Sequence, residues 1–330
     1  MNRRLALLVA AAALCFALFT TYEHVVARGM AYFTEDGSQI SFQRGSLEGH
    51  SGSPIQYRML TVWLLDGLMK GLAAVGIPRP IPTSFIVLRV LEDFAVFALA
   101  YAYYRRLGLS VPNTFIGMSL LAWGMSYAHH NSGLLFSTYL DVAFYLLAAW
   151  LVLVGRYAWL IPLCALAALN RETSGLIPFL LLAWFAARHL ETEGRLRVKA
   201  GEWLWFGLAI GAWVTVSVAL RLAYPGQEVI RPYGIPQGWP LLRFNALRWV
   251  TYVQLFAVLS ILPVLALSGR RMWPPALRAF AWAIVPVWFV VHAVGAIVAE
   301  SRLFLVPAAL VFVPGALFFA QGSESRERRD

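Results

Sequence analysis

The sequence is poor in charge and in cysteine. Only 13% of its 330 residues are Asp, Glu, Lys or Arg, about half of the roughly 25% found in soluble domains. The chain is 60% hydrophobic, and apolar runs of the length that spans a hydrocarbon core recur along it. This composition excludes a sizeable soluble domain and predicts an all-α fold, a polytopic transmembrane helical bundle.

Several functional motifs are also missing. The chain contains neither G-x-G-x-x-G nor a P-loop, so its motifs do not support nucleotide binding. Its two cysteines, Cys15 and Cys164, lie within apolar runs, which argues against a disulfide, and metal-ligand spacing is absent. We therefore predict no cofactor and no metal ligands, and leave open whether a divalent cation takes part.

The net charge of +10 does not indicate nucleic acid as a partner. The basic residues stand in short clusters between apolar runs, which is the pattern that orients helices in a membrane. Ten spans are expected, within a single transmembrane domain over 1–320 that is followed by a disordered cytoplasmic tail over 321–330. The expected spans are 5–27, 84–104, 112–128, 134–154, 157–169, 173–187, 203–222, 248–268, 277–298 and 303–320.

One further apolar segment, 57–75, is long enough to span but is not counted. It carries Arg58, Asp66 and Lys70, and the last two share a helix face because they are four residues apart. Such a segment suits a helix that lies in the membrane interface. We therefore predict an interfacial helix over 57–75.

The distribution of basic residues supports this choice. With the N-terminus in the cytoplasm and 57–75 lying flat, every short basic cluster falls on the cytoplasmic side. These clusters are Arg3-Arg4, Arg105-Arg106, Arg156, Arg188 to Lys199, Arg270 to Arg278, and the C-terminal tail. The predicted localisation is the cell inner (plasma) membrane, multi-pass, with both termini cytoplasmic and two long outer loops, 28–83 and 223–247.

With this topology, the unusual polar residues gather on the outer face. They are Glu35, Asp36, Arg58, His129, His130, Asn170, Arg171, Glu172, Arg231, Glu300 and Arg302. Taken singly, each has a plain alternative as a loop residue, a turn cap or half of a structural ion pair. Together they suit a phosphate-linked substrate, because arginine binds phosphate through a bidentate fork and a carboxylate can act as general base.

Two sets of charges lie deeper in the predicted spans. Arg89, Glu92 and Asp93 are expected to pair internally and to support helix packing, and Asp141 is expected to be buried against a partner. Charges inside spans are expensive and are usually paired or functional.

Three stretches carry a resemblance to a known family. They are span one with Phe33-Thr34-Glu35-Asp36; the interfacial helix leading to Leu88-Arg89-Val90 and Tyr103 to Gly108; and Ser137 to Asp141 with Ala167 to Leu176. Over roughly the first 190 residues they resemble the GT-C superfamily of polyprenyl-phosphate-sugar-dependent glycosyltransferases, such as the membrane cores of mannosyltransferases and aminoarabinose transferases. Many members carry a C-terminal soluble domain, and we expect none in this chain.

The resemblance implies an inverting membrane glycosyltransferase. Asp36 or Glu35 would be the catalytic base. Phosphate and substrate would be bound by Arg58, His129, His130, Arg171, Glu172, Arg231, Glu300 and Arg302. The implied partners are a lipid-linked sugar donor, a glycan, lipid or protein acceptor, and membrane lipids.

Two other functions stay open. A transporter or flippase of lipid-linked saccharide needs polar groups along a path through the membrane, whereas the charges here gather mostly at one face. A non-catalytic partner in polysaccharide assembly would keep the fold without the reaction.

Overall fold

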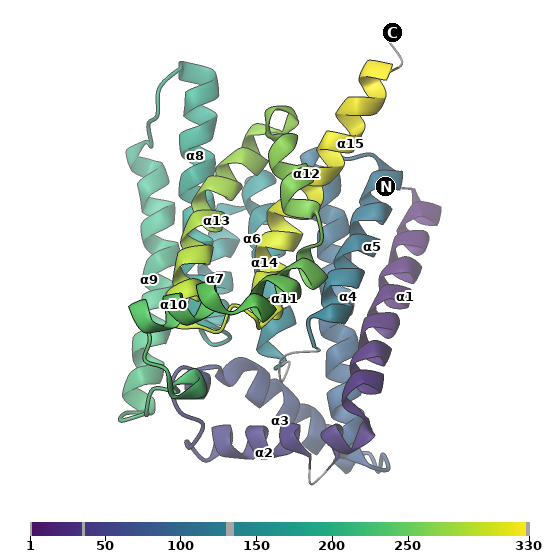
Figure 1. The fold of residues 1–330 in the computed structure, drawn as a ribbon, viewed down its shortest axis with the longest axis vertical. Helices are drawn as coiled ribbons and strands as arrows, with labels where there is room; N and C mark the ends of the chain where they lie inside the picture. Colours follow the sequence, from purple (N-terminus) through teal and green to yellow (C-terminus); the bar gives the residue numbers. More distant parts are fainter. Residues whose placement is uncertain (1, 35–36, 130–134, 328–330) are drawn as a thin grey trace.

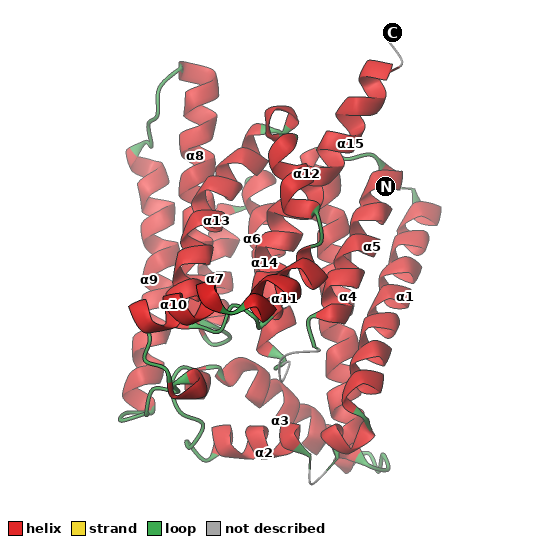
Figure 2. Ribbon diagram, viewed as in Figure 1, coloured by secondary structure: helices red, strands yellow, loops and turns green. Residues whose placement is uncertain are grey.

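The computed structural model describes residues 2–34, 37–129 and 135–327. Within these ranges the chain is helical, without a β-strand apart from one isolated bridge between Ser53 and Val229 (Figure 2). The helices of the first half are α1 (Arg3–Arg28), α2 (Ser38–Leu47), α3 (Met59–Ala74), α4 (Pro80–Leu107), α5 (Val111–Tyr127), α6 (Ser137–Leu153) and α7 (Leu160–Ala168). Those of the second half are α8 (Ile177–Glu193), α9 (Ala200–Ala223), α10 (Trp239–Leu247), α11 (Trp249–Leu259), α12 (Leu262–Ser268), α13 (Pro275–Gly295), α14 (Leu305–Pro307) and α15 (Val313–Glu327).

Several of these helices suit a membrane. Within the described ranges, five helical stretches are long and apolar enough to cross one, and α11 with α12 would be a sixth if that bent pair is one span. The five stretches are Arg3–Arg28, Glu172–Glu193, Ala200–Ala223, Pro275–Gly295 and Ser301–Gln321. The prediction of an all-helical, membrane-suited chain is confirmed at this level.

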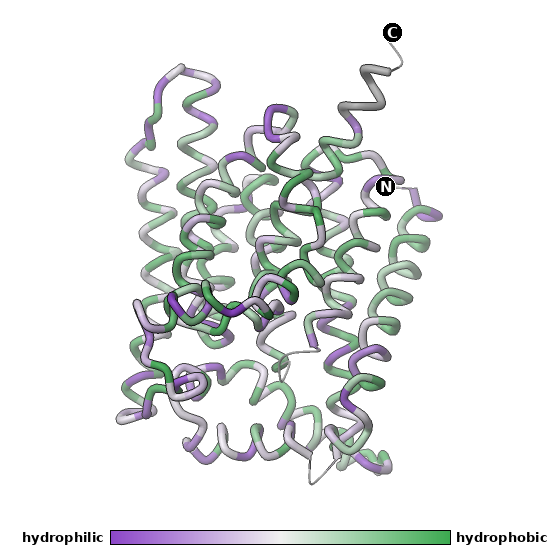
Figure 3. Tube along the Cα trace, viewed as in Figure 1, coloured by the Kyte–Doolittle hydropathy of each residue, from purple (hydrophilic) through white to green (hydrophobic). Residues whose placement is uncertain are grey.

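The two ends of the bundle differ in what they carry. Both termini and the α8–α9 and α12–α13 connections lie at one end, which we call the terminal end (Figure 1). Polar residues mark these connections (Figure 3). Helices α2 and α3 lie across the opposite end, which we call the α3 end (Figure 1). The segment predicted as an interfacial helix therefore caps this end of the bundle, where it packs on α4.

Two expected spans are not single straight helices. The segment predicted over 248–268 bends by 68° between α11 and α12, where Ser260 has a left-handed φ of 49° and Pro263 starts the next helix without an N–H to donate. The span predicted over 157–169 contains a short 3-10 turn and the nine residues of α7. Two charged residues, Arg171 and Glu172, follow α7 after Leu169 and Asn170.

The last helix is longer than expected. The spacing predicted a span ending at residue 320 and a disordered tail after it, yet α15 continues to Glu327. The segment after Gln321 contains no proline that would end a helix. The helix therefore extends into most of the segment predicted as tail.

A buried polar cluster joins α1 to α4. Arg89 pairs with Glu92 at 3.2 Å, and the hydroxyls of Thr20 and Thr21 donate to Asp93 at 2.7 and 3.2 Å. The guanidinium of Arg89 also lies over the ring of Phe136, with its central carbon 4.4 Å from the ring centroid. The expected internal pair is confirmed. Its partners all come from the helices around it, as charges removed from water require.

Close packing of α5 provides a stability test. A side chain at Gly117 would meet the Tyr104 ring and Leu317 at 2.9 Å, and the Tyr104 hydroxyl is tied to the carbonyl of Ala309 at 2.9 Å. We expect Gly117→Val to lower the free energy of unfolding by about 1–3 kcal/mol, because an overfilled core forces its neighbours to shift.

The matched control is Gly207→Val in α9, where an added side chain meets nothing within 4 Å. It should change stability by less than about 0.5 kcal/mol. Unfolding of both variants in mixed micelles measures the difference, and equal stabilities would contradict the packing.

Candidate functional site

A break in the chain after α7 positions the first charged residues. Residues Leu169 to Arg171 connect α7 to a 3-10 turn (Glu172–Leu176) that leads into α8. The Asn170 side-chain amide donates to the backbone carbonyl of Ser137 at 2.9 Å. The Ser174 hydroxyl donates to the backbone carbonyl of Arg171 at 2.5 Å. The break is therefore fixed from both sides, and Arg171 cannot follow a regular helical path.

Gly175 shows why this turn needs a small residue. A Cβ there would lie 2.9 Å from the indole ring of Trp213, whose N–H donates to the Ser174 hydroxyl at 2.9 Å. Helix α9 thus locks the turn that presents Arg171 and Glu172.

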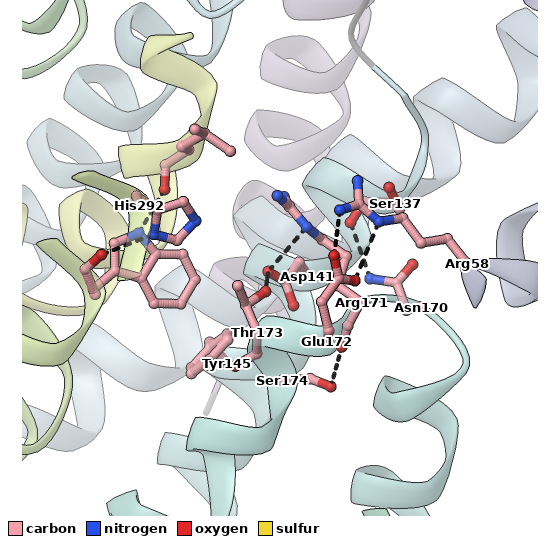
Figure 4. A network of polar contacts seen from close by, with 12 residues as sticks. Arg58, Ser137, Asp141, Tyr145, Asn170, Arg171, Glu172, Thr173, Ser174 and His292 are labelled. Carbon is pink, nitrogen blue, oxygen red and sulfur yellow. Dashed lines mark hydrogen bonds and ion pairs between the residues drawn. The ribbon is translucent and has the colours of Figure 1, made fainter. Parts of the chain in front are cut away.

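Three ion pairs meet beside this turn. Arg58, just before α3, contacts Glu172 through Nη2 at 2.5 Å and through Nε at 3.3 Å (Figure 4). Arg171 Nε lies 3.9 Å from Asp141 Oδ2 on α6. Arg302, in the 3-10 turn before α14, pairs with Glu300 at 2.8 Å. The α3, α6, α8 and α14 regions therefore contribute charges to one place.

Asp141 has a second partner in the same turn. The Thr173 hydroxyl donates to its Oδ2 at 3.1 Å (Figure 4). The side chain is fully buried, and its nearest cation is Arg171. The expectation of a buried, partnered Asp141 is confirmed.

The charges line a cavity of about 440 Å³. Its lining includes Arg58, Arg171, Glu172, His292, Glu300 and Arg302. Apolar residues of α13 and of the segment 229–232 complete the wall. The volume lies within the range of small-molecule sites, about 300–1,000 Å³.

Part of the segment predicted as the second outer loop is tied to the residues before α3 by its backbone. The backbone N–H of Ser53 donates to the carbonyl of Glu228 at 2.8 Å, and the N–H of Ile230 donates to the carbonyl of Ser53 at 2.9 Å. The loop predicted over 223–247 therefore contributes to the cavity wall through 229–237.

Both buried arginines stay cationic at neutral pH. Burial opposes the charge of Arg58, but the adjoining Glu172 carboxylate outweighs it and raises the pKa of Arg58. Burial, followed by repulsion from Arg58, lowers the pKa of Arg171 to about 10. The cavity therefore presents two guanidinium cations at neutral pH.

The predicted site residues fall into three groups. Arg58, Arg171, Glu172, Glu300 and Arg302 line the same cavity. Two others lie apart from its lining: Arg231 is exposed on the loop, and His129 is buried against His24, with ring centroids 5.5 Å apart. The remaining three, Glu35, Asp36 and His130, lie outside the described residues.

His129 is held in place through its backbone. Its carbonyl accepts a hydrogen bond from Arg28 at the end of α1, and its buried ring stacks on that of His24 in the same helix. This arrangement suits a packing role between α1 and the turn after α5.

His292 is a cavity residue that the sequence did not single out. Its Nδ1 lies 2.8 Å from the carbonyl of Trp288, and a carbonyl only accepts, so Nδ1 carries the proton. The neutral ring then keeps the Nε2 lone pair as a hydrogen-bond acceptor. Figure 4 places the ring across from the Arg58–Glu172 pair. The available signal was a lone histidine within an apolar helix, the kind of residue that marks functional positions in spans.

Comparisons with known proteins do not assign this site. No family model, no curated protein and no solved structure matches the chain. In the part of the chain that the structure describes, no group of three or more His, Cys, Asp or Glu side chains is arranged to hold a metal ion. The chemistry of the site therefore rests on its own residues.

The Arg58–Glu172 pair can be tested by a double-mutant cycle. The two side chains are 13% and 31% exposed, and removing either leaves a partly buried charge without its main partner. We expect Arg58→Gln and Glu172→Gln each to destabilise, and the double variant to recover part of the loss, with a coupling energy of about 1–3 kcal/mol.

The control cycle uses Lys70 and Asp66 in α3. This pair is also short, at 2.7 Å, but Lys70 is 76% exposed, and such pairs contribute only about 0.2–1 kcal/mol. Thermal unfolding of all variants measures both couplings. A coupling at Arg58–Glu172 no larger than the control would contradict the buried pair.

Proposed function

We propose that this protein is an inverting glycosyltransferase of the GT-C type that moves a sugar from a polyprenyl-phosphate donor to an acceptor. The proposal places it in the plasma membrane with about ten spans and both termini in the cytoplasm. The α3 end would then face outward. The single observation that carries the proposal is that Arg58, Arg171 and Arg302 line one cavity at the end opposite the basic connections.

The arginines suit the leaving group of such a reaction. Guanidinium forks bind phosphate oxygens through paired, charge-assisted hydrogen bonds. Three of them on one cavity would meet the negative charge that develops on polyprenyl phosphate as its bond to the sugar breaks. Preorganised donors of this kind commonly contribute about 2.7–4 kcal/mol each.

The carboxylates explain how the cavity accommodates these cations. Glu172 and Glu300 each pair with one arginine at 2.5 and 2.8 Å. Both carboxylates remain about one-third exposed, so they can turn aside as a phosphate takes their place. Binding would then exchange one set of charge-assisted bonds for another instead of leaving bare charges.

The reaction follows from this placement. A base removes the proton of an acceptor hydroxyl, the oxygen attacks the anomeric carbon, and the bond from that carbon to the phosphate oxygen breaks with inversion. Asp36 or Glu35 is the proposed base. His130 is a proposed additional donor to the phosphate, and the Nε2 of His292 is a hydrogen-bond acceptor for a sugar or acceptor hydroxyl in the same cavity.

A lipid-linked-saccharide transporter is the main alternative. It would need charges along a path through the bundle. The deeper charges Arg89 and Glu92 pair with each other and are only 2% and 4% exposed, which favours a packing role for them. A non-catalytic partner in polysaccharide assembly is the other alternative, and it predicts no transfer at all.

The proposal is tested by sugar transfer from a radiolabelled polyprenyl-phosphate donor in membranes that contain the protein. Arg171→Ala should reduce transfer at least 100-fold, since the loss of one preorganised donor costs about 2.7–4 kcal/mol. Asp36→Asn should reduce it at least as strongly, because the base is removed.

The matched control is Arg243→Ala, an exposed arginine of α10 that does not line the cavity. It should retain wild-type transfer at equal expression. Full activity in both Arg171→Ala and Asp36→Asn would overturn the assignment, and movement of the labelled donor across proteoliposomes without its consumption would favour the transporter.

A further inference from the structure

A second cavity lies far from the arginine-lined one, near the opposite ends of α6 and α7. It is an open groove of about 720 Å³. Its apolar wall includes Leu147, Leu151, Leu163 and Leu166. Because α7 packs mainly on α9, its other face and α6 leave this groove between them.

A positively charged residue lies at one end of the groove. Its lining includes Arg156, in the connection between α6 and α7. This arginine is fixed by its backbone: Gly155 adopts a left-handed φ of 75°, and the N–H of Arg156 donates to the carbonyl of Leu151 at 2.9 Å. These bonds form a Schellman ending of α6, so the side chain leaves the helix end at a defined point.

A second guanidinium stands nearby. Arg106, at the end of α4, donates through Nη2 and Nε to the carbonyl of Leu153 at 2.9 and 3.2 Å. This carbonyl belongs to the last turn of α6, next to the groove residue Val154. The lining contains no carboxylate, and no ion pair of Arg156 occurs among the described residues.

Two tryptophans border the same groove. Trp150 and Trp159 line it, and Trp159 is 63% exposed. Tryptophan favours the level of lipid headgroups. Apolar walls, an indole pair and a cation at one end thus occur in the order in which a phospholipid presents its acyl chain, its ester region and its phosphate.

We propose that this groove binds one acidic glycerophospholipid, with an acyl chain against α6 and α7 and the headgroup phosphate on Arg156. Basic pockets between spanning helices commonly bind acidic lipid headgroups. The site is separate from the proposed transferase cavity, so it stands whether or not that function is correct.

The test is native mass spectrometry of the full-length protein titrated with palmitoyl-oleoyl phosphatidylglycerol or palmitoyl-oleoyl phosphatidylcholine. The first phosphatidylglycerol should bind about fivefold more tightly than the first phosphatidylcholine, the factor expected for one cation at a lipid surface. Arg156→Gln should remove this preference. Arg197→Gln, an exposed basic residue outside the groove, should keep it.

A second variant tests the apolar wall independently. Leu166 is 46% exposed, so Leu166→Trp fills the groove without entering the core, and it should weaken the first binding step for both lipids. Equal affinities of the wild type for the two lipids would overturn the proposal, as would a preference that survives Arg156→Gln. A dimer of the chain that excludes lipid in the same spectra would assign the groove to a second copy and also overturn it.

Discussion

The pairs Arg58–Glu172 and Arg171–Asp141 join segments that are far apart in the sequence. Arg58, Arg171 and Asp141 are largely withdrawn from water, and a charge in such a place is tolerated only with a partner of opposite sign. Arg58 comes from the start of α3, Asp141 from α6, and Arg171 with Glu172 from the break before α8. Removing one partner would leave its mate unpaired, so the cap formed by α3, the broken α7–α8 pair and the cavity wall depend on one another.

This constraint also relates stability to function. Arginines that bind a phosphate must be present before the phosphate arrives, and carboxylates hold them in place meanwhile. In the proposed transferase, the partly exposed acids Glu172 and Glu300 would be such temporary partners, whereas the fully buried Asp141 would be a permanent one. A site of this kind stays stable when empty and can release cations toward a ligand. The deeper pair Arg89–Glu92, with both side chains 3% exposed, has no comparable freedom.

The sequence predicted features that depend on composition along the chain. The position of 57–75 at the end opposite both termini followed from its charges and from the distribution of basic clusters. The predicted topology put Arg58, Arg171 and Arg302 on one face of the membrane, and in the structure they line one cavity. These predictions needed only the alternation of apolar and charged segments.

Other features depend on contacts that a single sequence does not reveal. The bend at Ser260 uses a left-handed backbone in a run that reads as one apolar span. His292 lines the cavity because of the way α13 packs in the bundle. His129 lies away from the cavity, where its ring stacks on that of His24 in α1. Contacts between helices that are distant in the sequence determine these positions, and hydropathy along the chain does not predict such contacts.

We propose that the arginine-lined cavity and the basic connections lie on opposite sides of one membrane. It is tested most directly by sided labelling in a Cys15→Ser/Cys164→Ser background. Leu196→Cys, in the α8–α9 connection, and Glu228→Cys, in the segment beside the cavity, both replace exposed residues. In intact cells an impermeant maleimide should label only the cysteine at 228, and the one at 196 should react only after permeabilisation. Labelling of both positions from the same side would contradict the account.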